Sequence, residues 1–230
     1  MNPGQEMEDF AYAASHDLRA PLRSMENLAQ WIEEDLGAAP SPEVAENLKL
    51  MHGNIRRMQQ LLDDLLAYAR AGSLTEAPRR VDLKALLAEV LAAAKPRPGI
   101  KVELDSGLEP FQAEAGALGQ VLLQLLDNAL RHHDKATGLV VVSAAEQGSH
   151  VELTVTDDGP GIDPKQHEMI FKLGKTLKPK DEAQGSGVGL ALAKKLALKY
   201  GASISLISTP GQGSSFRLSW PKSTPKAPKI

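Results

Sequence analysis

The residues near the start of the chain that are best suited to chemistry are His16 and Asp17, which are neighbours within a helical pattern. The apolar residues around them, Ala14, Leu18 and Leu22, recur at helical spacing. His16 is two residues from both Ala14 and Leu18, so about 200° of helix rotation turns its imidazole away from the apolar side. An adjacent carboxylate can hold one ring nitrogen and leave the other as a nucleophile. We therefore predict an exposed, reactive histidine; an ordinary surface histidine is the alternative.

A second group of residues is glycine-rich. The stretch Gly185-Ser186-Gly187-Val188-Gly189-Leu190 directly precedes an apolar run that should be helical. Glycines let the backbone approach a bound group closely, and amides at a helix start attract anions. Such stretches are common before helices. A nucleotide site becomes the better interpretation because the chain also has the acidic turn Asp157-Asp158-Gly159-Pro160-Gly161 and polar residues grouped on one predicted helix.

Several polar side chains in these stretches are suited to bind particular parts of a nucleotide. Asp157 ends a predicted strand, where a buried carboxylate can accept the adenine amino group and favour ATP over GTP. Gln124 and Asn128, one helical turn apart, offer amide oxygens to Mg²⁺. Arg131 and His132 follow them and are expected near phosphate or ribose. Simple solvent exposure is an open alternative for each residue on this helix.

The segment 172–186 is polar and is predicted to form a loop. Lys175, Lys178 and Lys180 in it are suited to neutralise a phosphoryl group during transfer, although a solvated lysine cluster is equally compatible with the sequence. Phe171, just before the loop, is expected to pack against the base of the loop rather than to contact nucleotide.

The elements expected to position these residues fall into two parts. Residues 5–37 and 43–71 each carry an apolar seam in steps of three and four, separated by a short turn. Two such helices form an antiparallel hairpin that buries little surface alone. We expect two hairpins to pair into a dimeric four-helix bundle; docking within one chain is the alternative. A linker over 72–80, an α/β domain over 81–221 and a disordered tail over 222–230 complete the predicted fold, which is α+β.

Within the α/β domain, the sequence alternates between helix and strand patterns. Helices are predicted at 83–94 and 115–132, with a helical turn at 164–171 and a further helix after the glycine stretch. Strands are predicted at 101–104, 138–145, 150–156, 203–208 and 214–219.

Composition excludes several classes of protein. With 230 residues, 42% of them hydrophobic, the chain can form a substantial core, and with no cysteine it has neither disulfides nor a thiolate metal site. A net charge of −3 gives no basic field for nucleic acid. No stretch approaches the roughly 18 apolar residues of a membrane span. We expect a cytoplasmic protein that does not insert into a membrane.

Several motifs, in order, resemble those of the sensor histidine kinases of two-component signalling. Residues 15–22 are similar to the phosphoacceptor box of that family, 124–132 to its asparagine box, and 157–161 to its first glycine box. Ile170-Phe171 resembles the aromatic box, 185–190 the second glycine box, and 211–216, which contains Ser214, the third. The resemblance covers about residues 6–220. The sequence of residues 177–182 is most similar to that of the histidine kinases attached to phytochrome-type and related soluble sensors.

This resemblance implies a kinase core in which His16 attacks Mg²⁺-bound ATP while Asp17 holds the other ring nitrogen. It implies an ATP-binding α/β sandwich with a mixed sheet, with Ser214 among the nucleotide-binding residues. It also implies a homodimer and transfer of the phosphoryl group to the receiver domain of a response regulator. A sensor domain is absent from this chain, which is expected to be the cytosolic core of a larger sensor or a separate protein. Attack within or across the dimer stays open.

Two positions depart from the family pattern. Gln124 stands where asparagine is usual, which changes the reach of a metal ligand. Ala20 stands where many members carry threonine or asparagine, so we expect a competent kinase with weak phosphatase activity toward its partner. Two other functions remain open: a degenerate kinase that serves as a nucleotide-binding dimeric scaffold, and an ATPase of the related chaperone, mismatch-repair or topoisomerase type.

Overall fold

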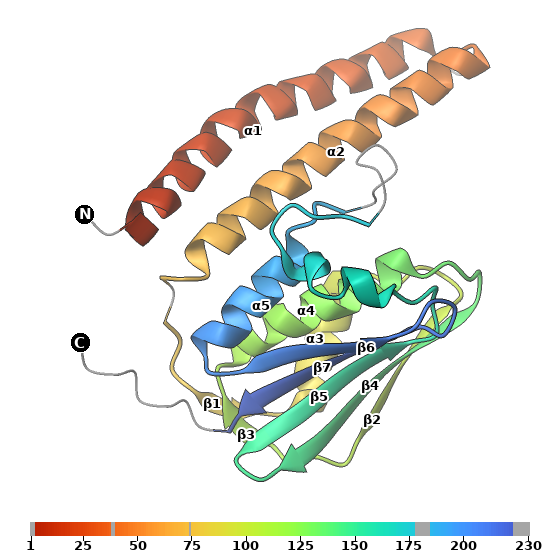
Figure 1. Cartoon of the computed structure of the whole chain (residues 1–230). Helices are drawn as coiled ribbons and strands as arrows, with labels where there is room; N and C mark the ends of the chain where they lie inside the picture. The colour runs from red at the N-terminus through yellow and green to blue at the C-terminus, as the bar shows by residue number, and fades with distance from the viewer. Residues whose placement is uncertain (1–2, 38–39, 74, 178–184, 223–230) are drawn as a thin grey trace. The chain divides into compact units, whose positions relative to one another are not determined.

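The computed structural model describes residues 3–37, 40–73, 75–177 and 185–222. The chain divides into two units, residues 1–73 and 74–230. The first is an antiparallel hairpin of α1 (Pro3–Leu36) and α2 (Pro42–Arg70) (Figure 1). The Ser41 hydroxyl accepts the Val44 amide at 3.3 Å, which caps the start of α2. The predicted hairpin is therefore confirmed, with helix bounds that differ by one or two residues.

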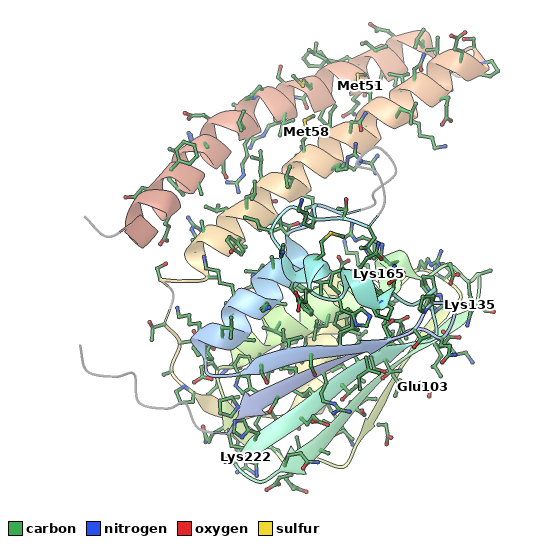
Figure 2. All side chains as sticks on the ribbon, viewed as in Figure 1. Met51, Met58, Glu103, Lys135, Lys165 and Lys222 are labelled. Atoms are coloured by element: carbon green, nitrogen blue, oxygen red, sulfur yellow. The ribbon has the colours of Figure 1, made fainter. Side chains whose placement is uncertain are left out.

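The predicted apolar seam of each helix divides into two rows in the structure, one buried and one exposed. Residues of the first row are spaced by seven and are buried between the helices: Leu22 and Ala29 on α1, and Leu48 and Ile55 on α2. Residues of the second row have the same spacing but are exposed: Leu18, Met25 and Ile32 on α1, and Met51 and Met58 on α2, the last two labelled in Figure 2. The first row closes the hairpin, and the second is suited to pack against further helices.

Within the described residues, the second unit has a five-stranded sheet in the order β2-β4-β5-β7-β6. Its strands are β2 (Ile100–Ser106), β4 (Gly138–Gln147), β5 (His150–Asp157), β6 (Ser203–Ser208) and β7 (Ser214–Pro221). Strands β2 and β4 are parallel and the other neighbours antiparallel, so the sheet is mixed, as expected. One face is covered by α3 (Leu83–Ala94), α4 (Ala115–His132) and α5 (Gly189–Lys199), as Figure 1 shows.

The core of this unit lies between the sheet and α4. Val151, Leu153 and Val155 of β5 are fully buried, as are Leu118 and Leu122 of α4. Because side chains of a strand alternate between faces, the buried positions of β5 are the odd-numbered ones. The last buried residue of β5 is Asp157, so its carboxylate lies at the edge of the core.

The structure corrects the predicted linker and tail. β1 (Arg79–Val81) pairs antiparallel with β3 (Phe111–Ala113), so the predicted linker 72–80 extends two residues too far. β3 was missed because three residues give too short an alternation to recognise. The Lys222 amide donates to the Ser149 carbonyl at 2.9 Å, so the tail predicted over 222–230 starts one residue too early. Residues 223–230 lie outside the described residues.

The predicted helical turn at 164–171 forms two short 3₁₀ segments, η1 (Pro164–Gln166) and η2 (Met169–Phe171). No helix in the described part of the chain is both long and apolar enough to cross a membrane.

Candidate functional site

Asp157 lies at the end of β5 and is 7% exposed. Its Oδ1 accepts the Gly159 amide at 2.9 Å. Burial raises the pKa of the Asp157 carboxyl above its usual value, although backbone hydrogen bonds from Gly159 and Ser214 act in the opposite direction. Ser214 is the cross-strand partner of Asp157 in β7 and is also buried. A perturbed carboxyl at a strand end is typical of a ligand site, and this one is suited to accept an amino group.

Two glycines allow the loops around Asp157 to pack backbone against backbone. Gly213 has φ +80°, and a Cβ there would lie 1.9 Å from the Asp157 carbonyl oxygen. Gly161 has φ +69°, and a Cβ there would lie 2.0 Å from the Thr209 carbonyl oxygen. The Ser208 hydroxyl, in turn, donates to the Gly213 carbonyl at 2.8 Å. The first and third glycine stretches therefore form one wall beside Asp157.

Gly213→Ala is expected to lower the free energy of unfolding by about 3 kcal/mol or more and to weaken nucleotide binding. The new methyl group would overlap a backbone oxygen that cannot move without disturbing β5. Thermal denaturation and nucleotide titration measure the two effects. Gly211→Ala is the matched control, since Gly211 has φ +79° but nothing within 4 Å of its Cβ position. Equal losses in both variants would show that backbone strain, not close approach, is the cause.

Asp158, the next residue, makes structural contacts instead. It accepts Lys135 Nζ and the Leu139 amide, each at 2.8 Å, and lies 2.7 Å from Nε2 of the buried His133. The Lys135 hydrogen bond is the largest of the effects that hold the pKa of Asp158 well below its usual range. A Cβ on Gly138 would lie 2.1 Å from the His133 ring. Asp158 thus anchors the segment between α4 and β4.

Asp158→Asn is expected to lower the free energy of unfolding at pH 7 by about 1 kcal/mol, a small value because the side chain is 47% exposed and screened. Its pKa is lower folded than unfolded. The stabilisation is therefore present above the unfolded value of about 3.9 and is lost as the pH falls toward the folded one. Urea unfolding at pH 7 and pH 3 should show that the wild type and the variant differ less in their free energy of unfolding at pH 3. An unchanged difference would contradict this role, and exposed Asp105→Asn serves as control.

Gln124 and Asn128 lie half-buried on α4, one turn apart. The Gln124 amide oxygen packs against the first residue of α5, since a Cβ on Gly189 would lie 2.5 Å from it. No side chain in the described residues caps α5, so its first amides are presented to an anion. No cluster of three metal-binding His, Asp or Glu side chains occurs in the described residues. Amide oxygens nevertheless suit Mg²⁺, which takes few protein ligands beside phosphates and water.

The second glycine stretch runs beside residues 172–175. The Gly174 amide donates to the Gly187 carbonyl at 2.9 Å, and a Cβ on Gly187 would lie 2.8 Å from the Lys175 carbonyl oxygen. The Arg131 side chain lies near Gly185, with its Cδ 3.8 Å from the Cβ position there. Arg131 also donates to both carboxylate oxygens of Asp127 at 3.0 Å. Lys175 and Arg131 therefore flank this stretch, whereas Lys178 and Lys180 lie outside the described residues.

The histidine predicted to be reactive, His16, is exposed, as expected. The His16 side chain is 74% exposed, and its Nδ1 lies 3.1 Å from Oδ1 of Asp17. When Nδ1 donates to a carboxylate, the lone pair of the ring lies on Nε2. Arg19 donates to Asp63 of α2 at 2.8 Å and ties this part of α1 to the other helix. Ala20, one turn after His16, is exposed and offers no polar side-chain group.

The predicted residues thus form three groups. The first lies around the turn after β5: Asp157, Gly159, Gly161 and Ser214. The second lies around the start of α5: Gln124, Arg131, Lys175, Gly185, Gly187, Gly189 and Leu190, with Asn128 on the adjacent turn of α4 and His132 exposed at its end. The third is His16 with Asp17 in the other unit. Sequence reasoning missed His133 and Asp158; the alternation in β5 could have separated Asp158 from Asp157.

Phe171 packs where it was expected. Its ring meets that of Phe216 edge-on, with the centroids 6.3 Å apart, and Lys194 Nζ lies 5.3 Å from the Phe171 centroid. These contacts fix the start of the loop against β7 and α5.

Two family models match the chain. Residues 6–74 match the His Kinase A (phospho-acceptor) domain, and residues 113–224 match the Histidine kinase-, DNA gyrase B-, and HSP90-like ATPase. These two ranges contain the exposed histidine and the wall of glycines, respectively.

Several curated relatives are 31% identical to the chain over the regions that align with it. It is 31% identical to cyanobacterial phytochrome B of Nostoc sp. over 92% of this chain and 29% of that protein. It is 31% identical to the methanogenesis regulatory histidine kinase FilI of Methanothrix harundinacea over 90% of this chain and 24% of that protein. It is 31% identical to the sensor histidine kinase ZraS of Escherichia coli over 91% of this chain and 44% of that protein. The chain spans less than half the length of these relatives.

Solved structures agree with this similarity. Full-length ShkA in complex with AMPPNP superposes with a TM-score of 0.74 at 26% identity, over 97% of this chain and 48% of that one. The mycobacterial sensor histidine kinase MprB superposes with a TM-score of 0.54 at 27% identity, over 64% of this chain and 99% of that one.

Proposed function

The chain belongs to the sensor histidine kinases, and we propose that it phosphorylates its own His16 with ATP and passes the phosphoryl group to an aspartate of a response regulator. The observation that carries this proposal is the exposed His16–Asp17 pair, within the range that matches a phosphoacceptor domain. In this scheme the hairpin, residues 5–71, accepts the phosphoryl group, and residues 81–221 bind ATP.

In the proposed reaction, Nε2 of neutral His16 attacks the γ-phosphorus of ATP in line. The N–P bond forms as the bond from the γ-phosphorus to the bridging oxygen breaks, and ADP leaves with that oxygen and its electron pair. The proton on Nδ1 stays on the ring, and Nδ1–H donates a hydrogen bond to Oδ1 of Asp17 across 3.1 Å. Asp17 thereby orients the imidazole and stabilises the positive charge that develops on it.

In this proposal, different residues of the second unit bind the base, the phosphates and the Mg²⁺ of ATP. Asp157 would accept the adenine amino group, with Gly159, Gly161 and Ser214 shaping the surface beside the base. The amides at the start of α5 would bind phosphate oxygens, assisted by Lys175. Gln124 and Asn128 would hold Mg²⁺, which would neutralise phosphate charge.

We also propose a homodimer that acts in the cytoplasm. The exposed second apolar row, which includes Leu18, Met25 and Ile32, is what a second hairpin would cover in a four-helix bundle. The receiver domain of the response regulator would then meet His16 on the outer surface of this bundle.

Labelling of the intact chain with γ-labelled ATP and Mg²⁺ tests the kinase. We expect label that is lost in acid, resists alkali and maps to the peptide containing His16, because a phosphoramidate hydrolyses in acid whereas a phosphoserine does not. ATP hydrolysis without labelling would favour an ATPase of the related fold. Nucleotide binding with neither hydrolysis nor labelling would favour a scaffold, for which Gln124 in place of asparagine is the specific argument.

Ala20 supports a second, narrower proposal: weak phosphatase activity toward the phosphorylated regulator. Alanine has no hydroxyl or amide with which to position water. We expect Ala20→Thr to accelerate loss of phosphate from a purified phospho-regulator relative to the wild type. Rapid dephosphorylation by the wild-type chain would contradict the proposal.

A further inference from the structure

The start of α4 is capped by a side chain from outside the helix. Glu114 is the N-cap residue, but it makes no capping hydrogen bond, and neither of its carboxylate oxygens has a partner in the described residues. The amides of Gly116 and Ala117 donate instead to the carboxylate of Glu76, at 2.9 and 3.0 Å. Glu76 thus satisfies two amides that a helix start leaves unpaired, at the positive end of the helix dipole.

Gly116 leaves room for this carboxylate. A Cβ at this position would lie 2.9 Å from Oε2 and 3.3 Å from Oε1 of Glu76. Alanine would suit the helix better than glycine but would push the carboxylate away. The contact can therefore be removed by changing Glu76 and weakened by changing Gly116.

The backbone of Glu76 is held by a second helix end. Its amide donates to the hydroxyl of Tyr200 at 3.3 Å. Tyr200 directly follows α5, is buried, and stacks on Trp220 of β7 with 5.8 Å between ring centroids. Glu76 therefore bridges the start of α4 and the end of α5, which lie at the same end of the unit in Figure 1. The opposite ends of these helices carry Asn128 and Gly189.

Glu76 also lies close to the boundary between the two units. α2 ends at Arg70, so residues 71–75 separate that helix from Glu76. Without the carboxylate contact, only the hydrogen bond from the residue-76 amide to Tyr200, at 3.3 Å, holds this position, and the next fixed element is β1, which begins at Arg79. Whenever that single bond opens, the tether gains residues 76–78, each adding up to about 3.5 Å of reach. A longer tether lowers the effective concentration of one unit around the other and loosens their relative orientation.

We propose that Glu76 is a positioning residue for phosphoryl transfer: it fastens the segment after the hairpin to α4 and α5 and so increases the rate at which His16 meets bound ATP. This inference rests on the proposed kinase function. Glu76 acts through the tether and not through the nucleotide, so its loss lowers the transfer rate while leaving ATP affinity unchanged.

The test uses the full chain with Glu76→Ala, which removes the contact, and with Gly116→Ala, which displaces the same carboxylate. We expect Glu76→Ala to reduce the initial rate of His16 labelling at saturating ATP by about twofold or more and Gly116→Ala to reduce it by less, with AMPPNP affinity unchanged from the wild type. The double variant should be no slower than the slower single variant, because only one contact is lost. Glu103→Ala, at an exposed position on β2, is the matched control and should label at the wild-type rate.

Hydrogen exchange at the amides of Gly116 and Ala117 supplies a readout that does not need kinase activity. These amides should be protected in the wild type and exchange faster in Glu76→Ala. If the wild type does not label, the kinase proposal fails while the exchange result still tests the contact. A folded Glu76→Ala that labels at the wild-type rate, or one that loses AMPPNP affinity in proportion to its labelling, would overturn the positioning role.

Discussion

His16→Gln is expected to bind ATP as tightly as the wild type and to take up no acid-labile phosphate. The imidazole is 74% exposed, so its replacement by a polar side chain leaves the hairpin folded. The amide nitrogen of glutamine has no basic lone pair to attack phosphorus, so labelling is expected to fall to background, a loss of at least about a thousandfold.

Intact-mass spectrometry after incubation with ATP and Mg²⁺ measures this effect, with AMPPNP titration alongside. His52→Gln is the matched control, because His52 is also on the hairpin but is half-buried between Glu26 and Glu33 of α1, at 3.2 and 3.5 Å. This variant should keep its label. Phosphate that persists in His16→Gln would place the acceptor elsewhere in the chain.

Asp157→Asn is expected to weaken ATP binding by about a hundredfold or more and to abolish labelling, since the variant loses the anionic acceptor for the adenine amino group.

The same substitution is not expected to lower the free energy of unfolding at pH 7. Burial raises the folded-state pKa of Asp157 above the unfolded value of about 3.9. The stability this carboxyl contributes is therefore complete below the unfolded value and is lost as the pH rises through the folded one. At pH 7 the uncharged asparagine should be at least as stable.

Calorimetric titration with AMPPNP and thermal denaturation without nucleotide measure the two effects. Asp158→Asn is the natural comparison, because it is expected to lose stability and keep ATP affinity. We thus predict that the substitution at Asp157 lowers ATP affinity and that the substitution at Asp158 lowers stability. Loss of stability with retained ATP affinity in Asp157→Asn would contradict the proposed role of Asp157.

The sequence by itself determined the helical hairpin, the exposure of His16 and most of the secondary structure. These features depend on local periodicity: steps of three and four bury one side of a helix, and alternation buries one side of a strand. The helices at 83–94 and 115–132 have the predicted bounds. The asparagine and glycine motifs also predicted which residues along the chain bind nucleotide.

Only the tertiary structure decided how these residues meet. It showed that Asp157 faces the core while Asp158 binds Lys135, that Gly213 is needed because the Asp157 backbone passes against it, and that Gln124 packs on Gly189. It also revealed that Glu76 caps a helix that begins far along the chain from it. Each of these contacts joins segments distant in sequence. Their geometry follows from the packing of sheet, helices and loops, which no local periodicity encodes.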